Sequence, residues 1–313
     1  MKEFNPTSSL QELHPVQLRT QSKSIYIARE PLTLDARRQA LHSETREAVS
    51  EYYGKLLTRS WIPTKLPFRE MQRLGGRLSE DTVTLLEGFM GVENFIGDFV
   101  MALLDAYQGD RHLKLFARFW GAEESRHGQA LELVLIHSGK RTKDQMNEHD
   151  DKISGKLWLP SQHRGVYGAL GGIVYSTMQE KETYLDYVRL RERVRNEYGL
   201  PEWRTRQEFR WGREIGVSEA ISKISRDEIA HHGTYLRLLR AWLCYFPDET
   251  IEKIKEIRDA FAMPAMNLLP NKLAFLKAIL RTELATKELQ ESEVFKPLLK
   301  SLDLTEDDLQ LVA

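Results

Sequence analysis

The chain has 313 residues, of which 41% are hydrophobic, and this is enough apolar material for one large core or two smaller ones. A formal net charge of −1 excludes a globally basic nucleic-acid-binding protein and a strongly acidic chain. The one cysteine, Cys244, excludes an internal disulfide, and every apolar run is far shorter than the ~20 residues that cross a bilayer. The N-terminus lacks the apolar stretch of a secretory signal, so we expect a cytoplasmic protein with no membrane span and no nucleic-acid partner.

Helical periodicity dominates the sequence, whereas strand-like alternation and hairpin turns are scarce. Prolines favour an irregular segment over residues 1–33, and a single helical domain is expected over 34–313. The polar stretch 139–162 is expected to be a long connection. The sequence thus predicts an all-α fold, a bundle of long helices. The predicted helices cover 34–59, 80–107 (capped by Ser79), 111–138 (capped by Asp110 and stopped by Gly139), 165–197, 205–245 and 249–262, with shorter ones after them.

The string "AEESRHG" at 122–128 places a carboxylate and an imidazole on an apolar helix face. Residues three apart lie on one face of a helix, so Glu124 and His127 can bind the same ion. The same pair recurs in "DEIAHH", where Glu228 and His231 also interrupt an apolar stripe.

Two further helices carry a lone glutamate on their apolar stripe, Glu93 in 80–107 and Glu180 in 165–197. An unpaired buried carboxylate costs several kcal/mol, and four together require compensation by bound cations. The order Glu, Glu-x-x-His, Glu, Glu-x-x-His is typical of carboxylate-bridged two-metal four-helix bundles. Carboxylates and imidazoles without a thiolate suit iron or manganese.

Chance is the alternative explanation for the two pairs. With nine histidines and 46 acidic residues in 313, chance alone places an acid three residues before one or two histidines. What distinguishes these two pairs from chance is their position, because both lie on apolar stripes and alternate along the chain with two lone glutamates. The neighbouring Glu123, Glu182 and His232 are expected to face elsewhere.

These segments resemble the soluble acyl-acyl-carrier-protein desaturases, typified by the plant stearoyl enzyme. That family carries "EENRHG" and "DEKRHE" where this chain has "EESRHG" and "DEIAHH". The resemblance extends over roughly 50–300. It includes "SWIP" at 60–63, "EDTVTLLEGFMGVENFIGDF" around Glu93, "GGIVYSTMQEKETY" around Glu180, and the Met-Pro-Ala of "FAMPAMNLLP".

The resemblance implies a homodimer of ferritin-like four-helix bundles with flanking helices, each holding a di-iron centre. It implies that Glu124 and Glu228 bridge the irons, that Glu93 and Glu180 bind one iron each, and that His127 and His231 supply nitrogen ligands.

Further roles follow from the same resemblance. It places Thr183 near the oxygen-binding side, and it implies that Trp61 and Asp227 pass electrons inward. Gly172 and Ile173 correspond to positions that line the family's acyl tunnel, although packing of the Gly171–Gly172 pair against another helix is an equal alternative.

The implied activity is an oxygen-dependent desaturation in fatty acid biosynthesis. The double bond is formed in an acyl chain on acyl carrier protein, with reduced ferredoxin as electron donor. The chain departs from the plant pattern at Gly97, where the family has proline, and before Met-Pro-Ala, where only Arg258 remains of a basic run.

Three other functions compete with this one. The second departure motivates a di-iron hydroxylase or N-oxygenase acting on a natural-product intermediate. Iron storage is disfavoured by the extra helices. A radical-generating ribonucleotide reductase subunit is disfavoured because Leu131 stands where those proteins hold a tyrosine.

Overall fold

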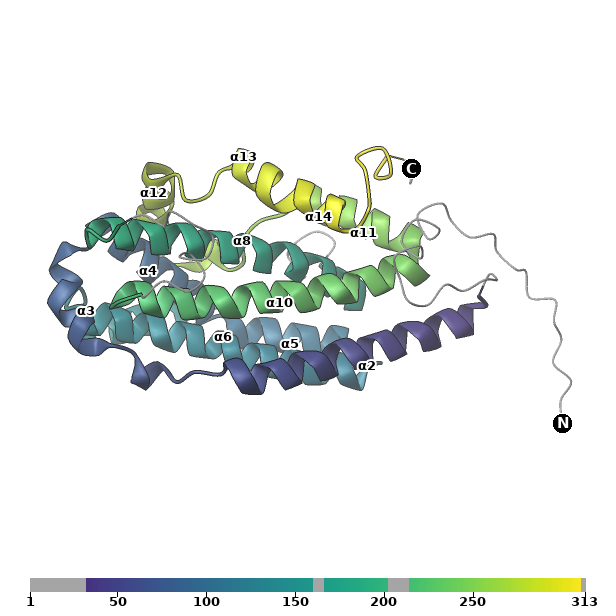
Figure 1. Ribbon diagram of the computed structural model, residues 1–313, viewed down its shortest axis with the longest axis horizontal. Helices are drawn as coiled ribbons and strands as arrows, with labels where there is room; N and C mark the ends of the chain where they lie inside the picture. Colours follow the sequence, from purple (N-terminus) through teal and green to yellow (C-terminus); the bar gives the residue numbers. More distant parts are fainter. Residues whose placement is uncertain (1–31, 160–165, 202–213, 311–313) are drawn as a thin grey trace, which may run out of the picture.

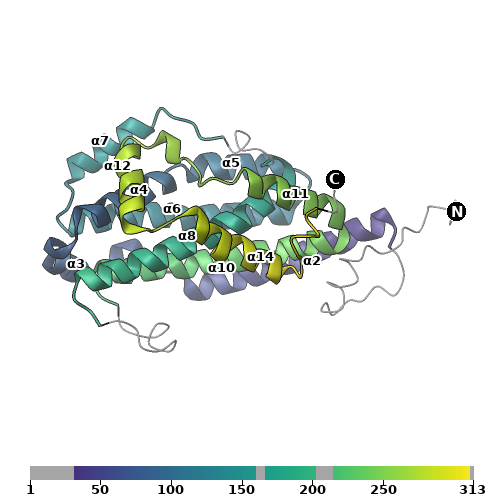
Figure 2. The ribbon, with the colours of Figure 1, turned by 90° about the horizontal axis from the view of Figure 1, so that it is seen from above.

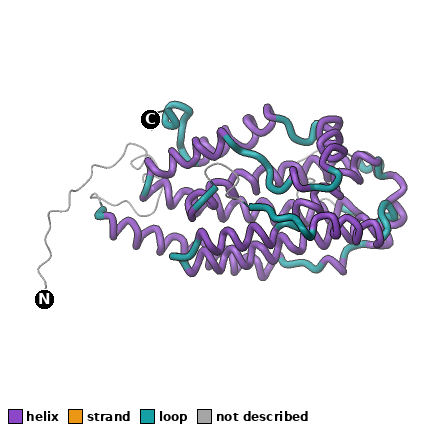
Figure 3. The backbone as a smooth tube through the Cα atoms, turned by 180° about the vertical axis from the view of Figure 1, so that it is seen from behind, coloured by secondary structure: helices purple, strands orange, loops and turns teal. Residues whose placement is uncertain are grey.

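A computed structural model of the chain describes residues 32–159, 166–201 and 214–310, and these residues are helical or irregular, with no strand among them (Figures 1 and 3). Most of the predicted irregular N-terminal segment, residues 1–31, lies outside the described residues.

Long helices run side by side along the molecule, so the all-α prediction is confirmed (Figure 1). Helices α8 and α10 pack together along much of their length, α2 packs on α10, and α4 packs on α6. These helices are α2 (Leu34–Arg59), α4 (Glu80–Glu93), α6 (Arg111–His137), α8 (Gly168–Glu197) and α10 (Val217–Tyr245).

Helix ends follow the predicted capping residues. The Ser79 hydroxyl accepts a hydrogen bond from the backbone N–H of Thr82, and the Asp110 carboxylate accepts those of His112 and Leu113. Gly139, at φ +71°, follows the end of α6 in the left-handed conformation that favours glycine.

The predicted continuous helix 80–107 is wrong, because the chain breaks between α4 and α5 (Ile96–Ala106). The backbone N–H of Phe95 bonds to the carbonyl of Val92, a tighter turn that ends α4 directly after Glu93. Helix α6 comes very close to this turn. A Cβ at Gly128 would lie 3.0 Å from the Asn94 side-chain oxygen and 3.2 Å from the Cβ of Glu93.

The expected long connection 139–162 contains a helix, α7 (Lys143–Ile153), which the sequence prediction missed. A capping box starts it, since Thr142 and Gln145 each bond the other's backbone N–H. Only Met146, His149 and Ile153 of this helix are buried, so its apolar signal is weak.

Shorter helices flank the bundle, as predicted. The C-terminal ones lie against the α4 and α8 side (Figure 2). The ring of Phe275 fills the space beside Gly88 and so holds α12 on α4. The flanking elements are η1 (Pro63–Lys65), α3 (Phe68–Leu74), η2 (Gly75–Arg77), α11 (Pro247–Asp259), η4 (Met266–Leu268), α12 (Lys272–Thr282), α13 (Lys287–Leu289), the π-helical η5 (Gln290–Phe295) and α14 (Lys296–Ser301).

Two apolar clusters fill the interior, with a polar layer between them. On α6, Trp120 belongs to one cluster and Leu131 to the other. On α10, Tyr235 belongs to the cluster that contains Trp120, and Ile224 belongs to the cluster that contains Leu131. Both Glu-x-x-His pairs lie between these positions. Within the described residues, no helix is both long enough and apolar enough to cross a membrane.

Candidate metal centre

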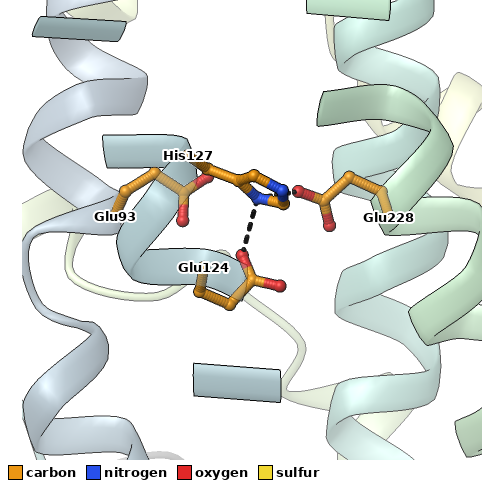
Figure 4. Close-up of side chains that lie close together, drawn as sticks. All are labelled: Glu93, Glu124, His127 and Glu228. Carbon is orange, nitrogen blue, oxygen red and sulfur yellow. Dashed lines mark hydrogen bonds and ion pairs between the residues drawn. The ribbon is translucent and has the colours of Figure 1, made fainter. Parts of the chain in front are cut away.

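The six predicted ligands come together inside the bundle, in two overlapping sets. Within each set the candidate ligand atoms lie within 4.8 Å of one another. Figure 4 shows the first set with its carboxylates and imidazole directed toward one another. Glu124 and Glu228 belong to both sets, which is the arrangement of two bridging carboxylates. The sets are Glu93, Glu124, His127 and Glu228, and Glu124, Glu180, Glu228 and His231.

The donor atoms fit a pair of cations. Glu180, Glu228, His127 and His231 are fully buried, yet Glu124, Glu180, Glu228 and His231 all present polar atoms without a hydrogen-bond partner. Buried polar atoms are normally paired, so these atoms point to a bound group. Four carboxylates balance the charge of two divalent cations, and a set of oxygen and imidazole donors suits iron or manganese.

Each imidazole turns its Nδ1 toward the cluster. The Nδ1 of His127 lies 3.1 Å from Glu124 and 3.0 Å from Glu228, while the Nδ1 of His231 lies 2.7 Å from Glu124 and 3.3 Å from Glu180.

The Nε2 atoms point away from the cluster, and each contacts a carboxylate of the other helix. The Nε2 of His127 on α6 lies 3.2 Å from Asp227 on α10, and the Nε2 of His231 on α10 lies 3.1 Å from Glu123 on α6. Such outer partners orient a ligating histidine and fix which nitrogen carries the proton.

Glu123 does face away from the ligand cluster, as expected, but the sequence prediction missed its contact with His231. It is 1% exposed and accepts hydrogen bonds from Tyr52, Arg59 and Arg126. A signal was present, because both motifs place an acid directly before the ligand glutamate: Glu123 before Glu124 and Asp227 before Glu228.

Two aromatic side chains hold the lone glutamates. The indole N–H of Trp120 donates to Glu180 at 2.8 Å, and the hydroxyl of Tyr187 donates to Glu93 at 2.8 Å. Each bond occupies one carboxylate oxygen. The other oxygen of Glu180 has no hydrogen-bond partner.

The protein alone distributes protons unevenly over the centre. Burial, and next the charge of Glu124, raises the pKa of Glu93 and of Glu180 well above the usual range. Although burial alone would raise it, the two imidazoles hold the pKa of Glu124 at about 2. Burial opposes the charge on the imidazoles, but neighbouring groups raise both pKa values well above normal: chiefly Glu124 and Asp227 for His127, and Tyr52 and then Glu124 for His231.

Trp61 lies between the outside of the bundle and the centre. Its indole N–H donates to Asp227 at 2.8 Å, and its ring lies parallel to that of His127 with centroids 6.4 Å apart. The guanidinium of Arg126 contacts both Trp61 and Asp227. It lies over the Trp61 ring, 5.1 Å from the ring centroid, and 2.9 Å from the Asp227 carboxylate.

The remaining predicted residues are buried on α8. Thr183 is 6% exposed and its hydroxyl has no hydrogen-bond partner. A Cβ at Gly172 would lie 2.8 Å from Leu103, so Gly172 packs closely on α5, and Ile173 belongs to the adjacent apolar cluster.

The other two residues expected to face elsewhere contact groups outside the ligand set. Glu182 accepts a hydrogen bond from Gln290, and His232 contacts the carbonyl of Thr177.

The comparison with known proteins agrees with this geometry. A family model described as "Fatty acid desaturase" matches residues 101–278, more than half of the chain. The chain belongs to the fatty acid desaturase family.

Curated relatives of this family member include two plant enzymes. Stearoyl-[acyl-carrier-protein] 9-desaturase of Gossypium hirsutum is 23% identical over 206 residues, which cover 63% of this chain and 47% of the relative. A second such enzyme, from Arabidopsis thaliana, is 23% identical over 232 residues, which cover 68% of this chain and 54% of the relative. The chain thus spans about half the length of the curated relatives it matches.

Solved structures share the ferritin-like fold. DesA2 of Mycobacterium tuberculosis, described as an acyl-ACP desaturase, has a TM-score of 0.56 at 18% identity and covers 88% of this chain and 99% of its own. A protein of Bacillus halodurans described as a class I ribonucleotide reductase has a TM-score of 0.50 at 17% identity and covers 85% of this chain and 95% of its own. At these identities the likeness concerns the fold alone.

Proposed function

We propose that this family member is an oxygen-dependent desaturase with a dinuclear iron centre, which introduces a double bond into a fatty acyl chain held on acyl carrier protein. The observation that carries the proposal is the pair of four-residue sets that share Glu124 and Glu228. Membership of the desaturase family and the names of the plant relatives support the reaction and the carrier.

Each ligand has a role in this proposal. Glu124 and Glu228 belong to both sets and would be shared by the two irons, while Glu93 and His127 would hold one iron and Glu180 and His231 the other. When bound, iron supplies the electron transfer to dioxygen that cleavage of an unactivated C–H bond requires and that no side chain can provide. The bundle supplies orientation and excludes water from the reacting carbons.

Electrons enter, in this proposal, through the hydrogen-bonded sequence Trp61, Asp227 and His127. These three side chains form an unbroken line of contacts from the partly buried indole to the centre. A ferredoxin is the proposed donor. Thr183 is proposed to lie on the oxygen-binding side, which its unpartnered buried hydroxyl supports, and Gly172 and Ile173 to lie beside the acyl chain.

Docking of an acidic carrier needs a positive surface, and Arg258 does not provide one. Its guanidinium is paired with Glu291 at 2.9 Å and Glu306 at 2.7 Å. We therefore propose that the carrier docks on a surface other than the one that the plant basic run would indicate. A homodimer and a cytoplasmic location remain part of the proposal.

Reconstitution tests the function directly. The chain is loaded with ferrous iron and supplied with oxygen, ferredoxin, a ferredoxin reductase and stearoyl or palmitoyl carrier protein, and the product is analysed by mass spectrometry. We expect the loss of two hydrogens from the acyl chain and about two irons per chain.

The same experiment separates the alternatives. A product heavier by one oxygen supports the hydroxylase or N-oxygenase, which the pairing of Arg258 favours by removing the family's carrier-docking charge. Many irons per chain support storage. Unchanged acyl chains at several lengths and on several carriers contradict the desaturase.

A further inference from the structure

A row of exposed basic side chains follows Trp61 on the segment that joins α2 to α4. Residues 59–77 contain five basic residues and one acidic residue, in a chain whose net charge is −1. One of the five, Arg59, is paired with Glu123 and Asp227 beside the metal centre. The other four are exposed and recur at every fourth position. We call these four the basic row: Lys65, Arg69, Arg73 and Arg77.

Helical geometry places the row on the outer side of this segment. Arg69 and Arg73 are four apart on α3 and so lie on one face of it, whereas Met71 and Leu74 are buried on the other. The 3₁₀ turn η2 follows α3 without a break and carries Arg77, whose guanidinium donates to a backbone carbonyl. The segment packs on α6 and turns round the end of the bundle at α3 (Figure 1). The row therefore faces solvent at this end of the bundle.

No carboxylate balances the charge of the row. Its four members form no ion pair among the residues that the structure describes. The acids closest in sequence have other partners. Glu70 accepts the backbone N–H of the residue before α10 at 3.2 Å. Glu80 pairs with Arg141 at 2.7 Å, and Asp81 pairs with Arg281. A local excess of positive charge on a nearly neutral protein favours association with an acidic partner.

The position of the row favours the electron donor over the carrier as this partner. Electrons are proposed to enter at Trp61, four residues before the row, and the adjacent Ile62 is 59% exposed and offers an apolar contact. The acyl chain is proposed to lie beside Gly172, which packs on Leu103 and Tyr107. Tyr107 lines a pocket with the start of α2 and the end of α10, at the end of the bundle away from α3 (Figure 1).

We propose that the basic row is the docking surface of an acidic electron-transfer protein of the ferredoxin class, which is held there beside Trp61. The inference rests on the proposed function, because it extends the route through Trp61, Asp227 and His127 outward to the donor. Reduction of one dioxygen to two waters takes two electrons from the acyl chain and two from the donor. Each reduced donor is oxidised by one electron, so two donors dock in turn for each double bond.

The test compares Arg69→Gln/Arg73→Gln with Lys296→Gln/Lys300→Gln, a matched control. Both pairs are exposed, four apart on a helix and without an ion pair among the described residues, but α14 lies well away from α3 (Figures 1 and 2). The first measurement is the affinity of the full chain for a plant-type [2Fe–2S] ferredoxin at low and at high salt. We expect Arg69→Gln/Arg73→Gln to bind about tenfold more weakly than the wild type at low salt, and the difference to shrink at high salt. The control should bind like the wild type.

The second measurement is the rate at which the iron-loaded centre is reduced by reduced ferredoxin and, separately, by dithionite. Dithionite is a small reductant that needs no docking surface. We expect Arg69→Gln/Arg73→Gln to be reduced about tenfold more slowly by ferredoxin, because charges at the edge of an interface act chiefly on the rate of association, and to be reduced normally by dithionite. Arg69→Lys/Arg73→Lys keeps both charges and should retain the wild-type rates.

Wild-type affinity and salt dependence in Arg69→Gln/Arg73→Gln contradict the docking surface. A wild-type chain that binds neither a plant-type nor a bacterial-type ferredoxin contradicts it as well. If this variant instead loses affinity for acyl carrier protein and binds ferredoxin normally, the row belongs to the carrier and the inference is overturned. Binding is measured without turnover. If no carrier yields a double bond, the proposed function therefore fails, while the affinities still decide whether the row docks the donor.

Discussion

Glu123 and Asp227 occupy equivalent positions, each one residue before a ligand glutamate and each bound to the histidine of the other helix. The six ligands could be predicted because a carboxylate on an apolar stripe is visible within one helix. Glu123 could not be placed in this way, because it is the adjacent residue, about 100° further around α6, and its partner His231 comes from α10, 108 residues away.

The contact between Glu123 and His231 predicts a loss of metal affinity in Glu123→Gln. The amide cannot hold the imidazole as a carboxylate does, so we expect a 10- to 100-fold weaker binding of the ion in the His231 half of the centre. Competitive titration with a metal chelator measures it. Glu182→Gln is the control, because Glu182 is also buried but bonds to Gln290, and equal affinities in the two variants would contradict the role of Glu123.

The raised pKa values at the centre predict that metal binding releases protons. Glu93, Glu180, His127 and His231 hold protons at higher pH than usual, and each must lose its proton to bind a cation. The affinity of the centre for metal ions should therefore increase as the pH is raised. Calorimetric titration of the metal-free protein in two buffers of different ionisation enthalpy measures the released protons, and identical heats in both buffers would exclude the release.

At the scale of the element, the ligand helices were predictable and their interruptions were not. Apolar periodicity continues through 80–107, yet the chain turns after Glu93 because α6 approaches there at Gly128, a tertiary contact that the local sequence does not encode. Helix α7 escaped prediction for the opposite reason, since few of its residues are buried and its cap, Thr142 with Gln145, is its main signal.

The close approach at Gly128 predicts opposite effects for two glycine substitutions. Gly128→Ala places a methyl group 3.0 Å from Asn94 and 3.2 Å from Glu93, so we expect α4 to shift and metal affinity to fall. Gly97→Ala meets nothing within 4 Å and should stabilise α5 by about 0.5–1 kcal/mol, since alanine is the better helix former. Denaturant unfolding and metal titration of both variants check this, and a stable Gly128→Ala protein with wild-type affinity would contradict the packing argument.

At the scale of the whole molecule, the fold is two apolar clusters joined through a layer of charge. The fold class followed from periodicity alone, because long amphipathic helices can bury their stripes only against one another. The position of the C-terminal helices did not follow, since it depends on contacts such as Phe275 on Gly88. The layer itself draws ligands from α4, α6, α8 and α10, so bound ions would link four helices.

This linkage predicts that metal binding raises the melting temperature. An ion that binds only the folded chain stabilises it by about 2.7 kcal/mol at 100 times the dissociation constant, which raises the melting temperature by roughly 4 °C per site for a chain of this size. Glu180→Gln should change the melting temperature in two ways. It removes a buried carboxylate, so the metal-free variant should melt at the wild-type temperature or above it, while its gain from metal should shrink. Calorimetric melting of both proteins with and without a chelator measures the four temperatures. If metal raised the melting temperatures of both proteins by the same amount, the stabilising ions would be bound at a site that does not include Glu180.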